Sequence, residues 1–267
     1  MLQGTKTLVG NGRVRDVYFV EHEGRKVVVK TLRGATDLKS QRNALDRHNR
    51  EVQTLDAMRG HPNIVGMLGV CDTTVVTEYY SASFQGVLFR NKQPLPIRRV
   101  VSMALDAARG LQALHELAFS IHVDMKPQQL LIDETGHVLL NDFNSARMMG
   151  VARDGTLCPV QSPKRRRPTV WPSPENYQGK PLTPAADVYS MGMIFFALMA
   201  GDLPYDGDLD RLETALRRGS RPEIDPSWHK GFMKVVQDMW GQDPQKRPPA
   251  RRVVSRLQKI EEELMAE

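Results

Sequence analysis

Two acidic residues, Asp124 and Asp142, flank a lysine and a glutamine in the stretch from 121 to 149, IHVDMKPQQLLIDETGHVLLNDFNSARMM. Between the two acids, residues 129–140 form two short apolar runs around a Glu-Thr-Gly turn, which predicts a β-hairpin. Such a hairpin would bring Asp124 and Asp142 to one end of a two-stranded ribbon. Carboxylates placed in this way could share a polyanion and its metal ion, because hard cations prefer oxygen ligands.

The N-terminal part alternates like a twisted β-meander, with three candidate strands between Thr7 and Lys30. The first turn, Gly10-Asn-Gly12, permits positive φ and the close approach of a ligand. Taken alone, this turn is also what a plain hairpin would have. Lys30 at the end of its strand could likewise be an ordinary surface residue.

A helix is expected from Ser40 to Met58, because apolar residues recur there at spacings of three and four. Glu51 falls on the inward side of this helix. A carboxylate that points inward is costly unless it is paired, and Lys30 is the obvious partner. The alternative is a solvated Glu51 at the edge of the apolar stripe.

The rest of the chain is read as strands followed by helices. The expected elements are strands at 66–71 and 74–78, a helical stripe at 101–114, an irregular segment at 150–174, a buried helix at 185–200 and three helical stretches within 209–264. Thr183 and the proline after it form a helix start, and Gly201 forms a helix end. This order predicts an α+β protein with a β-rich first lobe and a mainly helical second lobe.

The bulk composition excludes several classes of protein. The chain has 267 residues, a net charge of +6 and two cysteines, Cys71 and Cys158, too few for a disulfide framework. No apolar run approaches the roughly 20 residues of a membrane span, and the first candidate strand leaves no room for a signal peptide. Much of the basic excess is local, at 164–167 and 217–218, so nucleic-acid binding is not required. We therefore expect a cytoplasmic chain that contacts neither nucleic acid nor membrane; its oligomeric state is open.

The central segment resembles the catalytic and metal-binding segments of eukaryotic protein kinases, H-R-D-x-K-x-x-N followed by D-F-G. Other matches run along essentially the whole chain: GNGRVRDV at 10–17, Val29-Lys30, HPNIV at 61–65, SPE at 173–175, DVYSMG at 187–192 and DPQKR at 243–247. The resemblance implies one bilobal kinase domain over 1–267. The N-lobe would cover 1–80, the C-lobe 81–267 and the activation segment about 142–175. It also implies a buried pair between Glu175 and Arg247.

The same resemblance implies roles for individual residues. Lys30, held by Glu51, would contact the α- and β-phosphates of ATP, and Asp142 would bind Mg²⁺ or Mn²⁺. Asp124 would orient the acceptor hydroxyl and take its proton, and Lys126 would neutralise the transferring phosphate. The remaining candidates would surround the nucleotide or its metal: Gly10, Gly12, Val17, Val28, the gatekeeper Thr77, the hinge residues Glu78 and Tyr80, Leu131, and Gln129 as a second metal ligand.

Five positions depart from the kinase pattern. Val123 replaces the arginine that would bind an activation-segment phosphate, which argues against switching by that route. Asn144 replaces the glycine of D-F-G, although Asn tolerates left-handed conformations. Arg15 adds charge near the phosphates in place of the third glycine, and Val28 replaces the usual alanine. Gln129 replaces the metal-binding Asn and places its amide oxygen one methylene further out.

Three functions fit these residues. The first is an ATP- and Mg²⁺-dependent kinase of protein Ser/Thr hydroxyls, since Lys126 is similar to the Ser/Thr branch. The second is a pseudokinase scaffold, against which the retention of Lys30, Glu51, Asp124 and Asp142 argues. The third is a glycan kinase, because the first 80 residues are similar to protein O-mannose kinase, which also has Gln at this position. Ser162 and Thr169 are candidate phosphorylation sites, and the basic run at 164–167 is either a solvated loop or a site for an anionic partner.

Overall fold

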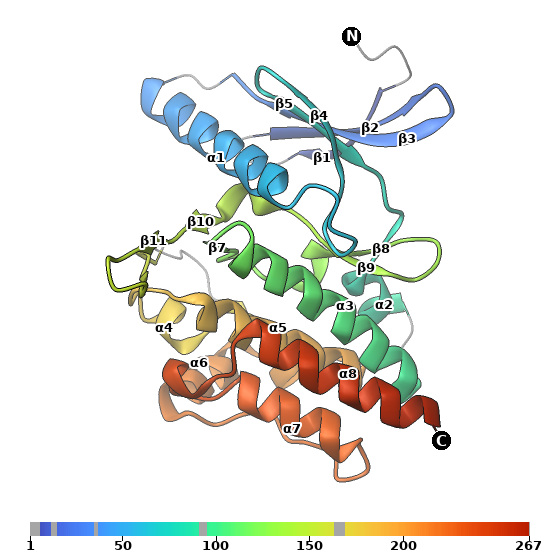
Figure 1. Cartoon of the computed structure of the whole chain (residues 1–267), viewed down its shortest axis with the longest axis vertical. Coiled ribbons are helices and arrows are strands. Elements are labelled where there is room, and N and C mark those ends of the chain that lie inside the picture. The colour runs from blue at the N-terminus through green and yellow to red at the C-terminus, as the bar shows by residue number, and fades with distance from the viewer. Residues whose placement is uncertain (1–5, 12–14, 35–36, 91–94, 163–168, 267) are drawn as a thin grey trace.

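The computed structural model describes residues 6–11, 15–34, 37–90, 95–162 and 169–266. A five-stranded antiparallel sheet with the order β1-β2-β3-β5-β4 forms the upper part of the molecule (Figure 1). Its strands are β1 (Lys6–Asn11), β2 (Arg15–His22), β3 (Arg25–Leu32), β4 (Met67–Cys71) and β5 (Thr74–Glu78). The predicted β-meander and the two later strands are confirmed, each within a few residues.

The alternation of β2 and β3 divides the sheet into two faces. Val20, Val27 and Val29 pack together on one face, and the register Val17↔Lys30 places these two residues on the other. Paired residues of antiparallel strands project to the same side, and so do residues two apart on one strand. Lys30 therefore faces away from the outer valine cluster.

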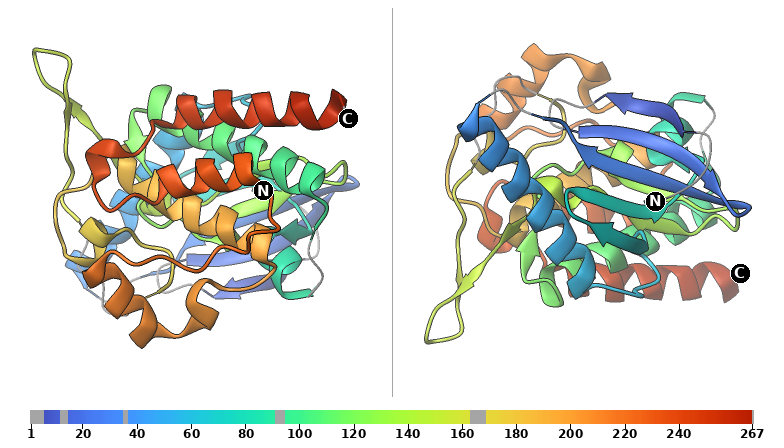
Figure 2. Two further views of the ribbon diagram at one scale, coloured as in Figure 1. Left: turned by 90° about the horizontal axis from the view of Figure 1, so that it is seen from below. Right: turned by 90° about the horizontal axis from the view of Figure 1, so that it is seen from above.

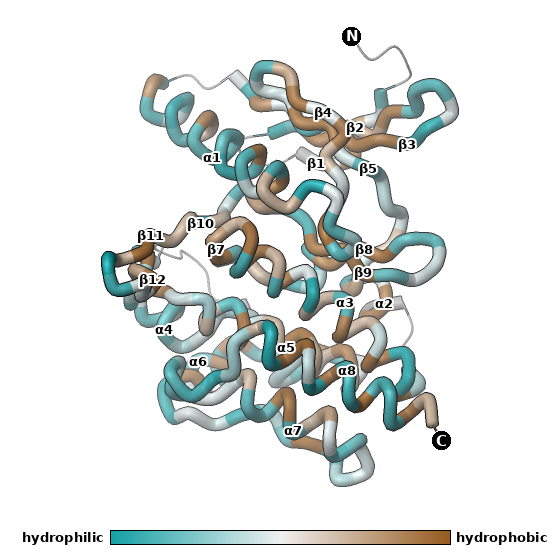
Figure 3. Tube along the Cα trace, viewed as in Figure 1, coloured by the Kyte–Doolittle hydropathy of each residue, from teal (hydrophilic) through white to brown (hydrophobic). Residues whose placement is uncertain are grey.

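Helix α1 (Leu38–Ala57) crosses this inner side of the sheet. Its N-cap Asp37 accepts a hydrogen bond from the Ser40 backbone N–H at 2.9 Å, as the first turn of a helix requires. The helix buries a narrow stripe that includes His48, Glu51 and Leu55, while much of its remaining surface is hydrophilic (Figure 3). The expected helix is confirmed, with both of its ends about a residue or two earlier than expected.

The lower part of the molecule is helical, and α5 lies at its centre (Figure 1). Its helices are α2 (Phe84–Arg90), α3 (Ile97–Glu116), α4 (Pro174–Tyr177), α5 (Pro184–Ala200), α6 (Leu209–Arg218), α7 (Lys230–Met239) and α8 (Ala250–Ala266). Helix α5 is buried along almost its whole length, as its apolar sequence predicts. It ends at Gly201 with φ of 72°, which favours glycine, whereas Thr183 occupies the N-cap without a side-chain capping bond.

A small hairpin, β8 (Leu130–Ile132) and β9 (Val138–Leu140), lies between the sheet and the helices. β6 (Ala82–Ser83) pairs with β8, and the 3₁₀ turns η1 (Pro127–Gln129) and η2 (Phe143–Ser145) precede β8 and follow β9. The hairpin predicted between the two acids is therefore confirmed. It fixes the positions of Gln129 and Asp142, because Asn141 N–H donates to the Gln129 carbonyl at 2.8 Å.

The segment expected to be irregular contains two short strands, β11 (Gly150–Val151) and β12 (Leu157–Cys158). They form a hairpin that projects from the body in both views of Figure 2. Just before it, β10 (Arg147–Met148) pairs with β7 (Ser120–Ile121). Two further 3₁₀ turns, η3 (Pro204–Gly207) and η4 (Pro244–Lys246), lie between the C-terminal helices. In the described ranges, no helix combines the length and the apolar character needed to cross a membrane.

Candidate active site

A buried ion pair joins the sheet to α1. The Lys30 Nζ donates to Glu51 Oε1 at 2.8 Å, and Glu51 is fully buried. Burial alone would raise the pKa of the Glu51 carboxyl, but the charges of Lys30 and Arg15 outweigh burial and lower it. The predicted pairing of Glu51 with Lys30 is confirmed, and the solvated alternative is wrong.

Arg15 supplies a second cation to the same carboxylate. Its Nη1 contacts Glu51 Oε2, and its Nη2 lies 3.2 Å from His48 Nδ1. Because arginine can only donate, His48 Nδ1 must accept. Burial and the Arg15 charge both lower the pKa of His48, which agrees with a neutral ring. The sequence indicated charge near the phosphates at Arg15 but not this contact.

The residues expected around the nucleotide base and ribose share the face of Lys30. Val28 pairs with Thr77 across β3 and β5, and Val17 pairs with Lys30 across β2 and β3. Thr77 is buried, while Val17 and Val28 are half-buried. The register thus places Val17, Val28, Lys30 and Thr77 on one face of the sheet, as the expected nucleotide site requires.

The remaining candidates for the nucleotide site lie in the hinge, in β1 and in β8. The Glu78 backbone N–H donates to the Gly66 carbonyl at 3.0 Å, and the Tyr80 hydroxyl donates to Glu78 Oε2 at 2.5 Å. Burial and this hydrogen bond raise the pKa of Tyr80. Gly10 lies in β1, where an added Cβ would come within 3.3 Å of the Val17 Cβ. Gly12 lies outside the described residues, and Leu131 is half-buried in β8.

Asp124, the acid expected to act as the general base, lies in a loop whose backbone is held by hydrogen bonds. Lys126 Nζ donates to Asp124 Oδ2 at 2.7 Å. Asp187 of α5 accepts the backbone N–H groups of His122 at 2.7 Å and Val123 at 3.0 Å. Val123 has φ of 70°, which is strained for a β-branched residue and persists only when its surroundings hold it. Asp187 therefore stabilises the conformation that presents Asp124.

The second acid lies in a corner formed by two amides. Gln129 Nε2 donates to Asp142 Oδ2 at 3.0 Å, and Asn144 Nδ2 contacts Asp142 Oδ1. The left-handed residue here is Asp142, with φ of 65°. Asn144 is absent from the described residues with positive φ, so the tolerance of Asn for such a backbone is not needed. Its side chain instead holds the carboxylate.

This corner has the chemistry of a Mg²⁺ site completed by phosphate. A carboxylate and one carboxamide are hard oxygen donors, and Mg²⁺ is usually held by one or two carboxylates together with substrate phosphates. If the Gln129 amide rotated by half a turn, its oxygen would take the place of its NH₂ group next to the Asp142 carboxylate. Within the described part of the chain, no three His, Cys, Asp or Glu residues gather to bind a metal unaided. The residues present therefore fit a metal that arrives with a nucleotide.

A bidentate ion pair supports the site from below. Arg247 Nη1 and Nη2 donate to Glu175 at 2.6 and 2.9 Å, and the Arg247 side chain is fully buried. Its guanidinium lies 4.9 Å from the centre of the Tyr189 ring. The pair expected between Glu175 and Arg247 is confirmed.

The structure brings together four expected pairs. Asp124 contacts Lys126, and Glu175 contacts Arg247. The other two pairs, Lys30 with Glu51 and Gln129 with Asp142, are connected through Asn141. Lys30 Nζ lies 3.4 Å from Asn141 Oδ1, on the residue before Asp142. Sequence reasoning missed the roles of Arg15 and Asn141, and it cited Asp187 only as part of a motif. The strand register would have revealed Arg15, since it lies two residues before Val17.

The candidate phosphorylation residues flank the undescribed part of the activation segment. Ser162 donates to the Asn176 carbonyl at 3.3 Å, and Thr169 is exposed. The basic run at 164–167 lies outside the described residues, so neither interpretation of it is tested.

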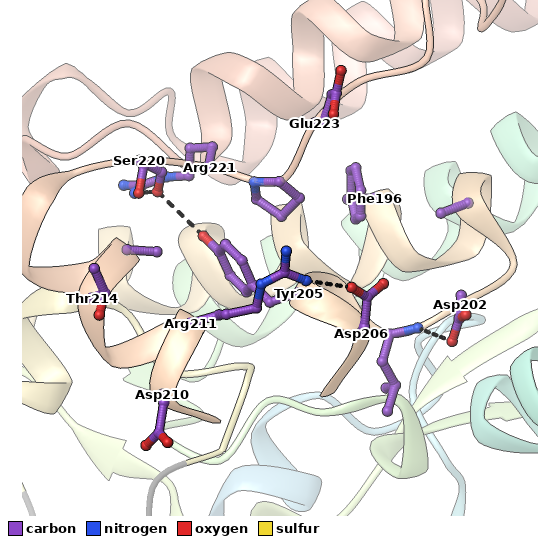
Figure 4. A pocket seen from close by; sticks show the side chains of 14 residues that line it. Phe196, Asp202, Tyr205, Asp206, Asp210, Arg211, Thr214, Ser220, Arg221 and Glu223 are labelled. Carbon is purple, nitrogen blue, oxygen red and sulfur yellow. Dashed lines mark hydrogen bonds and ion pairs between the residues drawn. The ribbon is translucent and has the colours of Figure 1, made fainter. Parts of the chain in front are cut away.

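A separate cavity of about 710 Å³ lies among the C-terminal helices (Figure 4). The Tyr205 hydroxyl donates to the Ser220 carbonyl at 3.2 Å, and Arg211 contacts Asp206 at 2.6 Å, across its lining. A second cavity of similar volume lies outside the hinge, between the β2–β3 turn and the β8–β9 turn. The hinge residues Glu78 and Tyr80 line this second cavity, whereas Lys30, Glu51, Asp124 and Asp142 line neither of the two.

The fold and the site define the class of the bilobal protein kinases: a five-stranded lobe with one helix, a helical lobe, a buried lysine–glutamate pair, and two acids on either side of the β8–β9 hairpin. A family model of protein tyrosine and serine/threonine kinases matches residues 2–257. The chain therefore belongs to this family, and it is a protein kinase domain. The family implies ATP, a divalent metal and a protein substrate.

Several curated proteins are similar to this chain. A probable serine/threonine-protein kinase of Dictyostelium discoideum is 31% identical over 260 residues, which are 94% of this chain and 27% of that protein. The serine/threonine/tyrosine-protein kinase HT1 of Arabidopsis thaliana is 28% identical over 255 residues, 92% of this chain and 63% of HT1. The serine/threonine-protein kinase STY46 of the same plant is 28% identical over 265 residues, 96% of this chain and 44% of STY46. The chain thus spans from about a quarter to nearly two thirds of the length of these relatives.

Proposed function

We propose that this chain is an active, ATP- and Mg²⁺-dependent kinase that transfers the γ-phosphoryl group to a protein Ser or Thr hydroxyl. The observation that carries the proposal is the assembled ion pair between Lys30 and Glu51, with Nζ and Oε1 at 2.8 Å, in a chain that keeps Asp124 and Asp142. The names of the relatives, which are protein kinases, favour a protein hydroxyl over the hydroxyl of a glycan.

Each retained side chain has a task in the transfer. The Lys30 ammonium pairs with the α- and β-phosphates while Glu51 holds it in place. Asp124 accepts the proton of the attacking hydroxyl as the new O–P bond forms and the bond to the ADP oxygen breaks. Lys126, 2.7 Å from Asp124, offsets the charge on the transferring group. Positioning and charge neutralisation of this kind supply most of the catalysis in phosphoryl transfer.

Asp142 and Gln129 would hold the metal. Mg²⁺ supplies charge neutralisation on the phosphate oxygens when it is bound. Gln129 must turn its amide for this role, because its NH₂ group donates to Asp142 in the structure. Asn144 contacts the other carboxylate oxygen, and we infer that it keeps the carboxylate oriented toward the nucleotide.

The contact between Gln129 and Asp142 also favours a second candidate, a pseudokinase that binds nucleotide without turnover. An amide NH₂ on Asp142 Oδ2 occupies the oxygen that a metal would need. If Gln129 keeps this orientation when nucleotide binds, its NH₂ group competes with a metal ion for Asp142 Oδ2, and Asn144 contacts Oδ1. The two candidate functions therefore make different demands on the orientation of the Gln129 amide.

The deciding experiment is ATP turnover by purified protein with Mg²⁺ or Mn²⁺ and a mixed panel of Ser/Thr peptides. Asp124→Ala and Asp142→Ala serve as the inactive controls. We expect turnover by the parent chain. Asp124→Ala should reduce it by at least about a hundredfold, a typical loss for a general base, and Asp142→Ala should reduce it strongly because the metal would lose its carboxylate ligand. Nucleotide binding without turnover in the parent chain would establish the pseudokinase instead.

A further inference from the structure

Arg15 lies on the same face of the sheet as the catalytic lysine. It lies two residues before Val17 on β2, and Val17 pairs directly with Lys30. Residues two apart on a strand project to one side. The side chain of Arg15 is therefore directed toward the inner face of the sheet, where α1 packs and where the nucleotide phosphates are expected.

The two oxygens of the Glu51 carboxylate contact two different cations. Lys30 Nζ contacts Oε1 at 2.8 Å, and Arg15 Nη1 contacts Oε2. All three residues are buried, with 8%, 7% and 0% of their surfaces exposed for Lys30, Arg15 and Glu51. Within these three residues, the single negative charge of the Glu51 carboxylate faces two positive charges.

Two further side chains that contact Lys30 or Arg15 in the described structure, His48 and Asn141, add no negative charge to the cluster. His48 accepts from Arg15 and is neutral, because its pKa is lowered by burial and by Arg15. Asn141, which lies 3.4 Å from Lys30 Nζ, is an uncharged amide. A buried positive charge is costly unless an anion compensates it. The cluster is thus prepared for an anionic ligand on the face of Lys30.

We propose that Arg15 is a second phosphate-binding cation of the nucleotide site, and that it shares Glu51 with Lys30. The inference rests on the proposed nucleotide binding. A guanidinium has five N–H donors, of which Arg15 uses one on Glu51 and one on His48. The remaining donors suit the oxygens of a di- or triphosphate, which arginine recognises in bidentate fashion.

The test separates binding of phosphates from binding of the base. Dissociation constants for adenosine, ADP and ATP are measured by calorimetry on the parent chain, Arg15→Met and Arg15→Lys. Arg25→Met is the matched control, since it removes an exposed arginine from the neighbouring strand. We expect Arg15→Met to weaken ATP and ADP by about tenfold or more, the size of a hydrogen bond to a charged group. Adenosine should bind unchanged, Arg15→Lys should recover part of the loss, and Arg25→Met should have no effect.

Two results would overturn the proposal. Equal weakening of adenosine and ATP in Arg15→Met would mean that Arg15 only holds α1 in place. Unchanged ATP binding in Arg15→Met would mean that the arginine does not reach the phosphates. If the parent chain bound none of the three ligands, the proposed function would fail and this inference with it, so the parent measurement distinguishes the two failures.

Discussion

Removal of the carboxylate of Glu175 is the sharpest test of the packing beneath the site. Arg247 has a side chain with no exposed surface, and its guanidinium donates to both oxygens of Glu175 at 2.6 and 2.9 Å. In Glu175→Gln the shape is kept, but the buried guanidinium loses its counter-charge. The carbonyls of Ala185 and Gly241, each 2.8 Å from an Arg247 donor, do not replace that charge.

The magnitude follows from burial. Breaking a buried ion pair by removing one partner costs about 3–5 kcal/mol, because the remaining charge stays buried. An exposed pair contributes only about 0.2–1 kcal/mol. For a domain of this size, each kcal/mol shifts the melting temperature by about 2–4 °C. Glu175→Gln should therefore lower the melting temperature by about 6–20 °C.

Thermal unfolding by calorimetry or circular dichroism measures this loss. Glu263→Gln is the matched control, because Glu263 pairs with Lys259 at 3.9 Å on an exposed surface of α8. The control should shift the melting temperature by no more than about 4 °C. A Glu175→Gln variant that melted as close to the parent as the control would refute the view that this pair stabilises the helical lobe.

Three other predictions concern Gln129, His48 and the close approach of Gly110 to the backbone of Asn63. Gln129→Asn should keep or raise turnover at low Mg²⁺, since it restores the shorter amide; a large loss would mean that the site is built around Gln. Folding lowers the pKa of His48 below its ordinary value of 6.5. Below about pH 6.5 the unfolded chain therefore takes up a proton more readily than the folded chain, and stability should fall with pH. Between pH 7.5 and 5.5, the melting temperature of His48→Gln should decline less than that of the parent chain. Gly110→Ala should destabilise by about 1–3 kcal/mol in urea unfolding, because its Cβ would lie 2.6 Å from the Asn63 carbonyl oxygen. Gly86→Ala, with open space around it, should not destabilise.

Local pattern was enough to predict most of the fold. The apolar character of α5 and its end at Gly201 depend only on neighbouring residues, and so does the alternation of β2 and β3. The β8–β9 hairpin was likewise visible, because its two apolar runs flank a turn. The short β11–β12 hairpin was missed because its two-residue strands are too short to show a period.

The site was predictable where a charge needs a partner and less so where two partners compete. An inward Glu51 required a cation, and the sequence offered Lys30 at the end of a strand. Arg15 could be joined to Glu51 only through the register of β2 against β3, which no local pattern specifies. The clamp by Asp187 was similarly hidden, because it acts on the backbone of His122 and Val123 from a helix more than 60 residues away.

Arg15 and Gln129 have opposite expected effects on how fully the negative charge of a bound triphosphate is neutralised. As proposed above, the arginine adds a buried positive charge where the phosphates are expected, and the glutamine would offer a metal ion its amide oxygen on a longer side chain. A triphosphate must have most of its charge neutralised in either case. If Arg15 binds phosphate as proposed, the protein itself supplies part of the neutralisation that a second metal ion would otherwise supply. The loss of the shorter amide at position 129 is then tolerable because of the arginine at position 15, and the two departures from the kinase pattern form one compensated change.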